Sequence, residues 1–181
     1  MIMKKTLFIS LGLVFSLAAT AQKLSTRSAE VSFFSATPVE NIDATNQQVS
    51  SILNLDNGQF AFLVPIKAFQ FEKALMQEHF NENYMESGQF PTAKFTGEIV
   101  DYKKISLDKD GKYTLVLAGT MTMHGVSQEI KQEVMITVKG GKLSLKSDFN
   151  ILASDYKVEI PAAKADNISN SLAVKVSATY D

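Results

Sequence analysis

Apolar and polar residues alternate along several long stretches of this chain, and this period of two constrains the fold more than any other feature. Residues 128–139 put Ile130, Val134 and Ile136 on one face and mostly charged residues on the other. A β-strand points successive side chains to opposite faces, whereas a helical stripe would need spacings of three and four. The pattern therefore predicts strands with one buried and one solvated face. It is clear in residues 92–102, 128–139, 142–149 and 171–180, and weaker in 29–33, 49–55, 60–66 and 113–123.

Pairs of turn-forming residues lie between these segments. Glycine, and to a lesser degree asparagine and histidine, tolerates the positive φ of tight hairpin turns. Successive hairpins make an antiparallel meander, and closing about eight strands into a barrel removes the exposed edges. The predicted fold class is therefore all-β, an eight-stranded antiparallel barrel. The turn pairs are Asn57-Gly58, Asp110-Gly111, His124-Gly125 and Gly140-Gly141.

Two stretches interrupt the meander. Residues 68–86 contain a run of helix-forming residues, in which Met76, Phe80 and Tyr84 repeat every four positions along one face. This stretch predicts one short helix between strands. The long connection after the seventh strand segment is rich in small and polar residues, and it predicts only a short strand, Tyr156–Ile160.

A basic start, an apolar run and a small-x-small motif predict that residues 1–21 are a secretory signal peptide. These features are Lys4 and Lys5, the run Leu7–Ala19 and the triplet Ala19-Thr20-Ala21. The alternative is a membrane anchor, but an apolar run of about fifteen residues falls short of the roughly 20 that span a bilayer. Residues 22–181 are then expected to form one domain with a single core, in a periplasmic or secreted protein.

Composition excludes several classes of function. The chain has no cysteine, which excludes disulfides, thiolate metal sites and a lipid attached to an N-terminal cysteine. Removing Lys4 and Lys5 from the 18 basic residues leaves 16 against 19 acidic ones, a net charge of −3. No basic stretch interleaves with aromatic residues, so neither nucleic acid nor an anionic membrane surface is an implied partner. No apolar run after the signal peptide is long enough to cross a membrane as a helix.

An exported barrel of about eight strands could instead span an outer membrane, with its polar faces turned into the lumen. The polar faces of residues 128–139 and 142–149 carry many charges, among them Glu129, Lys131 and Lys146. A lumen of eight strands holds only side chains or one small ligand, so those charges would be poorly solvated there. The apolar faces are therefore predicted to point inward, in a water-soluble barrel.

Catalytic constellations are hard to assemble from this sequence. His79 and His124 are the only histidines; His124 lies in a predicted turn, and His79 could face either a pocket mouth or solvent. There is no HExxH spacing, nucleophile elbow, phosphate loop or dinucleotide fingerprint. We therefore predict no catalytic residues, no metal site, no cofactor and no enzymatic activity. Turnover of a lipid head group by His79 with a nearby carboxylate is the one enzymatic alternative.

The inward face of the barrel is the remaining candidate site. Its apolar side chains either fill the barrel as a plain core or line a pocket for an apolar guest, and periodicity does not separate these alternatives. Flexible methionines, such as Met76 and Met121, suit an adaptable pocket. The residues predicted to line the site are Phe33, Phe60, Phe62, Phe69, Phe71, Phe95, Ile99, Leu115, Leu117, Met121, Ile136, Leu145, Phe149 and Val174.

Two motifs resemble segments of the YceI family. Residues 76–86 (MQEHFNENYME) and 90–95 (FPTAKF) are similar to the family's short helix, aromatic turn and following strand. Residues 117–126 (LAGTMTMHGV) are similar to its hairpin, and residues 149–160 match more loosely. Residues 25–33 lack the histidines that many members carry there, which marks a short, divergent variant.

The resemblance implies a lipocalin-like eight-stranded barrel in the periplasm that binds polyisoprenoids, such as a quinone tail, along its axis. The first hypothesis is therefore an exported protein that stores or shuttles a long isoprenoid-type lipid. The second is a structural or stress-associated barrel with a filled core. The sequence also leaves open whether the protein forms a homodimer.

Overall fold

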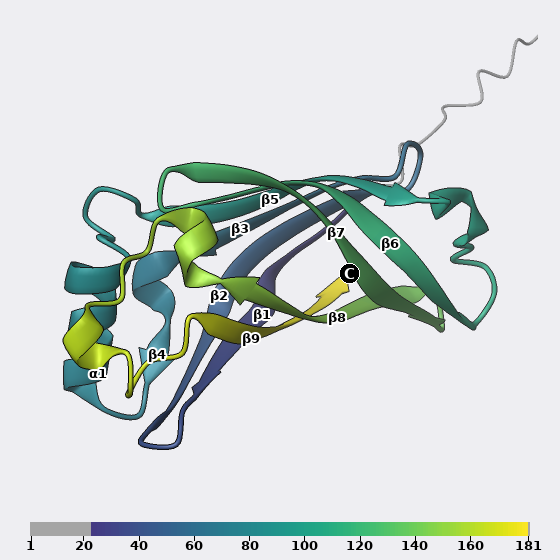
Figure 1. Cartoon of the computed structure of the whole chain (residues 1–181). Coiled ribbons are helices and arrows are strands. Elements are labelled where there is room, and N and C mark those ends of the chain that lie inside the picture. Colours follow the sequence, from purple (N-terminus) through teal and green to yellow (C-terminus); the bar gives the residue numbers. More distant parts are fainter. Residues whose placement is uncertain (1–22, 181) are drawn as a thin grey trace, which may run out of the picture.

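Eight long antiparallel strands close into a barrel, as the sequence predicts (Figure 1). The long strands are β1 (Lys23–Ala36), β2 (Asn41–Asn54), β3 (Gln59–Pro65), β5 (Thr92–Val100), β6 (Gly111–Met123), β7 (Val126–Lys139), β8 (Lys142–Leu152) and β9 (Ser171–Tyr180). Hydrogen-bonded neighbours follow the order β1-β9-β8-β7-β6-β5-β3-β2, and pairing of β1 with β2 closes the ring. A two-residue strand, β4 (Gln70–Phe71), pairs with β2. The computed structural model describes residues 23–180, so the signal peptide predicted for residues 1–21 lies outside the described residues.

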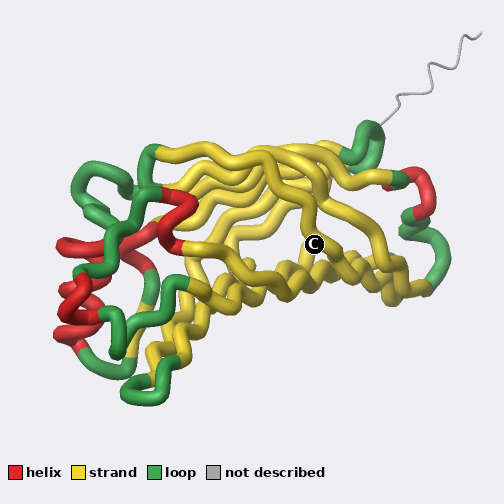
Figure 2. Tube along the Cα trace, in the orientation of Figure 1, coloured by secondary structure: helices red, strands yellow, loops and turns green. Residues whose placement is uncertain are grey.

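Helical turns gather mainly at one end of the barrel, which we call the helical end (Figure 2). The predicted short helix is present as α1 (Ala74–His79), which continues into a π-helical turn, η2 (Phe80–Tyr84). The 3-10 turns are η1 (Ile66–Ala68), η3 (Tyr102–Lys104), η4 (Ala153–Tyr156) and η5 (Ala162–Lys164). Of these, η3 lies at the opposite end, directly after β5.

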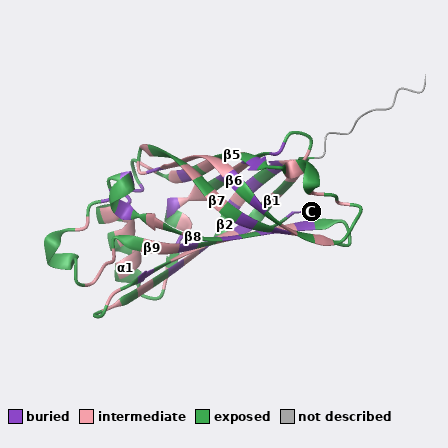
Figure 3. Cartoon of the chain, turned by 45° about the vertical axis from the view of Figure 1, so that its right-hand side comes forward, coloured by how far each residue is buried: buried purple, intermediate pink, exposed green. Residues whose placement is uncertain are grey.

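The apolar faces of the strands point into the barrel, as predicted. In β7, Val134, Ile136 and Val138 are at most 1% exposed, whereas the adjacent Glu133 and Met135 face solvent. Buried stretches run along the strands in Figure 3, and the tip of the β7–β8 hairpin, residues 139–142, is exposed. The alternation of the sequence thus separates the interior from the surface directly.

Three of the predicted hairpin turns are confirmed by their backbone angles. His124 and Gly125 have φ of 50° and 73°, and Gly140 and Gly141 have φ of 58° and 78°. Gly58 also has a positive φ, of 74°. Two successive residues with positive φ match the right-handed twist of the flanking strands, which is why such turns dominate short hairpins.

The prediction of a turn at Asp110-Gly111 is wrong. The chain turns earlier, first at Asp101 (φ 61°) and, after η3, again at residues 107–109. Gly111 is the first residue of β6. The Asp110 carboxylate instead accepts a hydrogen bond from the Gly140 amide at 2.8 Å, so it stabilises the neighbouring β7–β8 turn.

The predicted short strand Tyr156–Ile160 is also wrong. Tyr156 ends η4, and Lys157 follows with a left-handed φ of 56°, which breaks an extended run. The Val158 amide donates to the Ala153 carbonyl at 3.1 Å. Tyr156 and Val158 are buried because this segment folds over the helical end, so their apolar character reflects a cap rather than a strand.

The interior is packed solid near η3, which we call the packed end. Loop residues after β5, including Tyr102 and Ile105, close this end against the barrel core. The side chains that fill it are at most 1% exposed, and they come from the strand segments nearest η3: Leu53, Ile99, Ile136, Leu143 and Tyr180. The room for a ligand must therefore lie elsewhere along the barrel.

Candidate functional site

The barrel is hollow at its helical end, where a cavity of about 250 Å³ lies. We call it the first cavity. Its walls come from the strands β1, β2, β3, β4, β5, β6, β8 and β9, and α1, η2 and the connection after η4 cover it. A cavity of this size is larger than the roughly 150 Å³ engineered cavity that binds benzene.

Four phenylalanine rings join the covering segment to the barrel wall. Phe80 of η2 lies 5.6 Å from Phe33 of β1, 5.5 Å from Phe69 and 5.0 Å from Phe71, measured between ring centroids. Phe33 also contacts Phe69 at 5.4 Å. The Phe33–Phe80 pair is stacked and the others are tilted or edge-on, and such pairs contribute beyond simple burial. All four rings line the first cavity, so its cover and its wall share one aromatic surface.

Methionines supply a second part of the lining. Met76 and Met85 come from the covering segment, and Met121 and Met123 come from the end of β6. An unbranched thioether side chain adapts its shape at little cost. The cavity can therefore adjust to the shape of an apolar guest.

Polar side chains line the same cavity at its covered end, and we call them the polar rim. They lie at strand ends, on helical turns and in connections, and they are Ser35, Glu40, His79, Tyr84, Lys164, Asn167 and Ser169. The Ser169 amide donates to the Ser35 hydroxyl at 2.9 Å. Burial raises the pKa of Tyr84, so this side chain remains a neutral phenol at ordinary pH. The rim thus offers polar partners next to an apolar interior.

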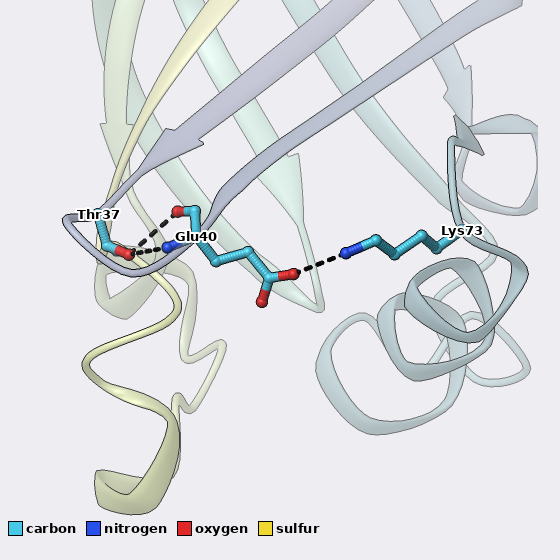
Figure 4. Close-up of polar contacts among 3 residues, drawn as sticks. All are labelled: Thr37, Glu40 and Lys73. Atoms are coloured by element: carbon cyan, nitrogen blue, oxygen red, sulfur yellow. Dashed lines mark hydrogen bonds and ion pairs between the residues drawn. The ribbon is translucent and has the colours of Figure 1, made fainter.

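An ion pair joins the β1–β2 turn to the segment before α1 (Figure 4). The Lys73 ammonium lies 3.1 Å from a Glu40 carboxylate oxygen. Thr37 shapes the turn, since its hydroxyl donates to the Glu40 carbonyl at 3.0 Å and accepts from the Glu40 amide at 3.0 Å. The Lys73 side chain is 62% exposed and the Glu40 side chain 30%, and ion pairs that water reaches in this way contribute only about 0–1 kcal/mol. The contact therefore positions the cover but resists opening only weakly.

His124 connects three segments at the helical end, a contact that the sequence did not reveal beyond the turn itself. One ring nitrogen, Nε2, lies 2.9 Å from Glu86 Oε2, and the other, Nδ1, lies 3.1 Å from the Tyr156 carbonyl oxygen. Phe90 packs edge-on against the same ring, with 4.6 Å between the centroids. We call this group the His124 staple. It fixes the end of the cover to the β6–β7 turn and to η4.

A second, smaller cavity of about 60 Å³ lies deeper in the barrel. Its lining is mostly aromatic and aliphatic, with polar contributions from Lys94 of β5, Gln132 of β7 and Ser147 of β8. The Ser147 hydroxyl donates to the Glu133 carbonyl at 2.6 Å. This bond bridges β7 and β8 just beyond Met135 and Lys146, where their regular pairing ends.

Most of the predicted lining residues border one of the two cavities. Phe33, Phe69 and Phe71 line the first cavity; Phe62, Phe95, Leu117, Leu145 and Phe149 line the second; Met121 and Val174 line both. Phe60, Ile99, Leu115 and Ile136 face inward but line neither, because they belong to the packed core. His79 is exposed on the polar rim. The helical pattern noted in the sequence also supplied Met76, Phe80 and Tyr84, which all line the first cavity.

The arrangement suits burial of an apolar chain with a polar group held at the rim. Within residues 23–180, no three acidic or histidine side chains come together as a metal-binding group. In the same range, no helix is both long and apolar enough to cross a membrane.

The fold is shared with solved structures at low sequence identity. A polyisoprenoid-binding domain from Saccharophagus degradans matches with a TM-score of 0.75 and 13% identity, over 90% of this chain and 99% of that one. BcnA from Burkholderia cenocepacia matches with a TM-score of 0.68 and 13% identity, over 84% of this chain and 96% of that one. The YceI protein of Campylobacter jejuni matches with a TM-score of 0.53 and 14% identity, over 99% of both chains. A search of curated protein sequences gives no match. Residues 22–180 match the YceI-like domain, and this chain therefore belongs to the YceI-like family.

Proposed function

We propose that this protein binds an isoprenoid-type lipid by its long apolar chain and stores or carries that lipid after export. The single observation that carries the proposal is the hollow helical end, a cavity of about 250 Å³ with apolar walls and a polar rim. Each methylene removed from water contributes roughly 0.8 kcal/mol, so an apolar chain needs few polar contacts for affinity. The rim then holds the head group.

Two further observations support this assignment. The Saccharophagus degradans domain is described as polyisoprenoid-binding, and it shares the barrel fold of this chain. A basic and apolar N-terminal segment supports a signal peptide over residues 1–21, and hence a periplasmic or secreted site of action. The structural alternative, a barrel filled by its own side chains, accounts for the packed end but leaves the hollow end without a role. We propose binding without catalysis, because both cavities are lined mainly by apolar side chains.

The test is a binding titration of delipidated protein with a prenyl quinone. Calorimetry measures the binding, since the chain has no tryptophan whose fluorescence could report it. We expect saturable binding near one lipid per chain. Phe80→Asp places a charge in the aromatic wall of the first cavity and should weaken binding at least about tenfold. Phe80 lies in the cover rather than in a strand, so the barrel should still fold.

Phe34→Asp is the matched control, because Phe34 is 40% exposed on the outer face of β1. It should bind the quinone as the wild type does. Mass spectrometry of lipids that co-purify from the native host provides a second readout. If delipidated wild-type protein takes up no long apolar ligand, the proposal fails.

A further inference from the structure

Five side chains lie at the junction of the two cavities, and we call them the ring. Each member lines both cavities, and the members come from five different strands around the barrel: Val31 of β1, Val64 of β3, Ala93 of β5, Met121 of β6 and Val174 of β9. Val64 and Ala93 are direct partners across β3 and β5. The ring comes from five of the eight long strands, and it marks the narrowing where the first cavity, of about 250 Å³, gives way to the second, of about 60 Å³. We call it the constriction.

The space on either side of this constriction is limited. If a cavity of roughly 150 Å³ holds the six carbons of benzene, the first cavity, at about 250 Å³, holds on the order of ten carbons. By the same measure, the second cavity of about 60 Å³ adds only two or so. Beyond it lies the packed end, where Leu53, Ile136 and Tyr180 are at most 1% exposed. The interior is thus a short pocket with a narrow extension.

We infer that the constriction sets the length of apolar chain that the barrel encloses, at about ten carbons, or two isoprene units. This inference rests on the proposed function and adds a chain-length limit to it. A longer prenyl chain is held by its terminal units, and the remainder of the chain stays outside the first cavity.

Met121 is the adjustable member of the constriction. The other members are small or β-branched, with few or no rotatable side-chain bonds, whereas methionine has three. Met121 pairs with Phe95 across β5 and β6. Phe95 in turn packs edge-on against Phe60 of the core, with 4.8 Å between the ring centroids. The core therefore holds the cross-strand partner of Met121 in place. Shortening the Met121 side chain should therefore join the two cavities without emptying the packed end.

The test measures the affinity of delipidated protein for primary alcohols of about six to sixteen carbons, by displacement of a fluorescent apolar probe. In the wild type, affinity should rise about fourfold with each methylene, which corresponds to roughly 0.8 kcal/mol, and should stop rising near ten carbons. A rise that continues unchanged to sixteen carbons would mean an open tube and would overturn the inference. No binding of any alcohol would instead count against the proposed function itself.

Variants locate the limit. In Met121→Ala, the chain length at which affinity stops rising should increase by about two carbons or more. Val174→Ala should increase it too, with a smaller loss of packing. Met135→Ala is the matched control, because Met135 is 50% exposed on the outer face of β7, and its plateau should equal that of the wild type. Circular dichroism verifies the fold of each variant. If both ring variants fold and keep the wild-type plateau, the constriction does not set the length.

Discussion

Two buried hydroxyl groups hold the packed end of the barrel together. Ser51 Oγ and Tyr180 Oη lie 2.7 Å apart, and both residues are 1% exposed. Burial raises the pKa of Tyr180 to about 12, although the hydrogen bond with Ser51 partly opposes that shift. The folded barrel therefore favours the neutral phenol strongly.

We expect the protein to lose stability as the pH rises from about 10 to about 12. Tyrosine in the unfolded chain ionises near 10.0, whereas Tyr180 in the folded protein ionises near 12, so the folded state binds more protons in this window. The contribution of Tyr180 is present in full below pH 10 and is lost as the pH passes through the folded pKa. Two pKa units on one group amount to roughly 2–3 kcal/mol. Urea unfolding at a series of alkaline pH values measures this slope.

Tyr180→Phe is the informative variant for that profile. It should flatten the slope above pH 10 while costing about 1–3 kcal/mol at neutral pH, because Ser51 loses its buried partner. A smaller slope should remain, since burial also raises the pKa values of Tyr84 and Tyr156. Equal slopes in the variant and the wild type would show that Tyr180 does not govern alkaline stability.

Single inward residues also show where sequence reasoning ends. Alternation predicted correctly that Phe33 faces inward, and its neighbour Phe34 is 40% exposed on the outside. Alternation could not tell that Phe60 packs in the core while Phe62, two positions later, lines the second cavity. Both face inward, and their depth along the barrel depends on the stagger between strands. That stagger comes from long-range pairing, which a local pattern does not contain.

The covering segment from α1 to Phe90 is held by few polar contacts. The Glu40–Lys73 ion pair is exposed, and the His124 staple holds the opposite end of the segment. Between them, the contact is mainly aromatic, through Phe80. A cover of this kind can open without disturbing the strand ladders, since most of the barrel's hydrogen bonds lie elsewhere.

Glu86→Gln should loosen this cover. The carboxylate that lies 2.9 Å from His124 Nε2 becomes a neutral amide. Since the Glu86 side chain is 51% exposed, we expect a cost of only about 0.5–1.5 kcal/mol in unfolding free energy. Amide exchange should accelerate in residues 81–90 and 153–158, which the staple joins. Glu82→Gln, an exposed carboxylate earlier in the same segment, is the control and should change neither measurement. Unchanged exchange in Glu86→Gln would show that the staple does not hold the cover.

Elements differed in how well the sequence predicted them. Hairpins with paired turn residues, such as Gly140-Gly141, were predicted correctly because the turn chemistry is local. The segment 156–160 was not, because its alternating apolar residues are buried by folding over the barrel end rather than by strand pairing. The helix of residues 74–79 was found from its periodicity, but its position over the cavity followed only from the closed barrel.

At the level of the whole barrel, one half is a solid core and the other encloses the cavities. The sequence predicted the closed barrel and its inward apolar face, since both follow from alternation and turns. It left open whether that interior is filled, and the structure shows both conditions in one molecule: Ile99 and Leu115 pack in the core while Phe69 and Phe71 border open space. Which part of the interior is filled depends on the summed volumes of side chains from many strands. Those side chains come together only in the folded barrel.

This division should produce a gradient of stability along the barrel. Amide exchange should be slowest in strand residues at the packed end, such as Ile136 and Leu143, and faster in the covering segments 74–90 and 153–169, which bury less apolar surface. An apolar ligand such as decanol, at about one hundred times its Kd, should stabilise the protein by roughly 2.7 kcal/mol and raise the Tm by about 5–11 °C.

The same ligand should slow exchange mainly in the covering segments, because it binds only when they are closed over the first cavity. Phe80→Asp with the same amount of decanol is the control, and its Tm should rise far less, since the charge weakens binding to the cavity. Uniform slowing along all strands of the wild type, with no preference for residues 74–90, would mean that the ligand stabilises the barrel as one unit. The hollow end would then have no separate opening equilibrium, and the cover would be a fixed part of the wall.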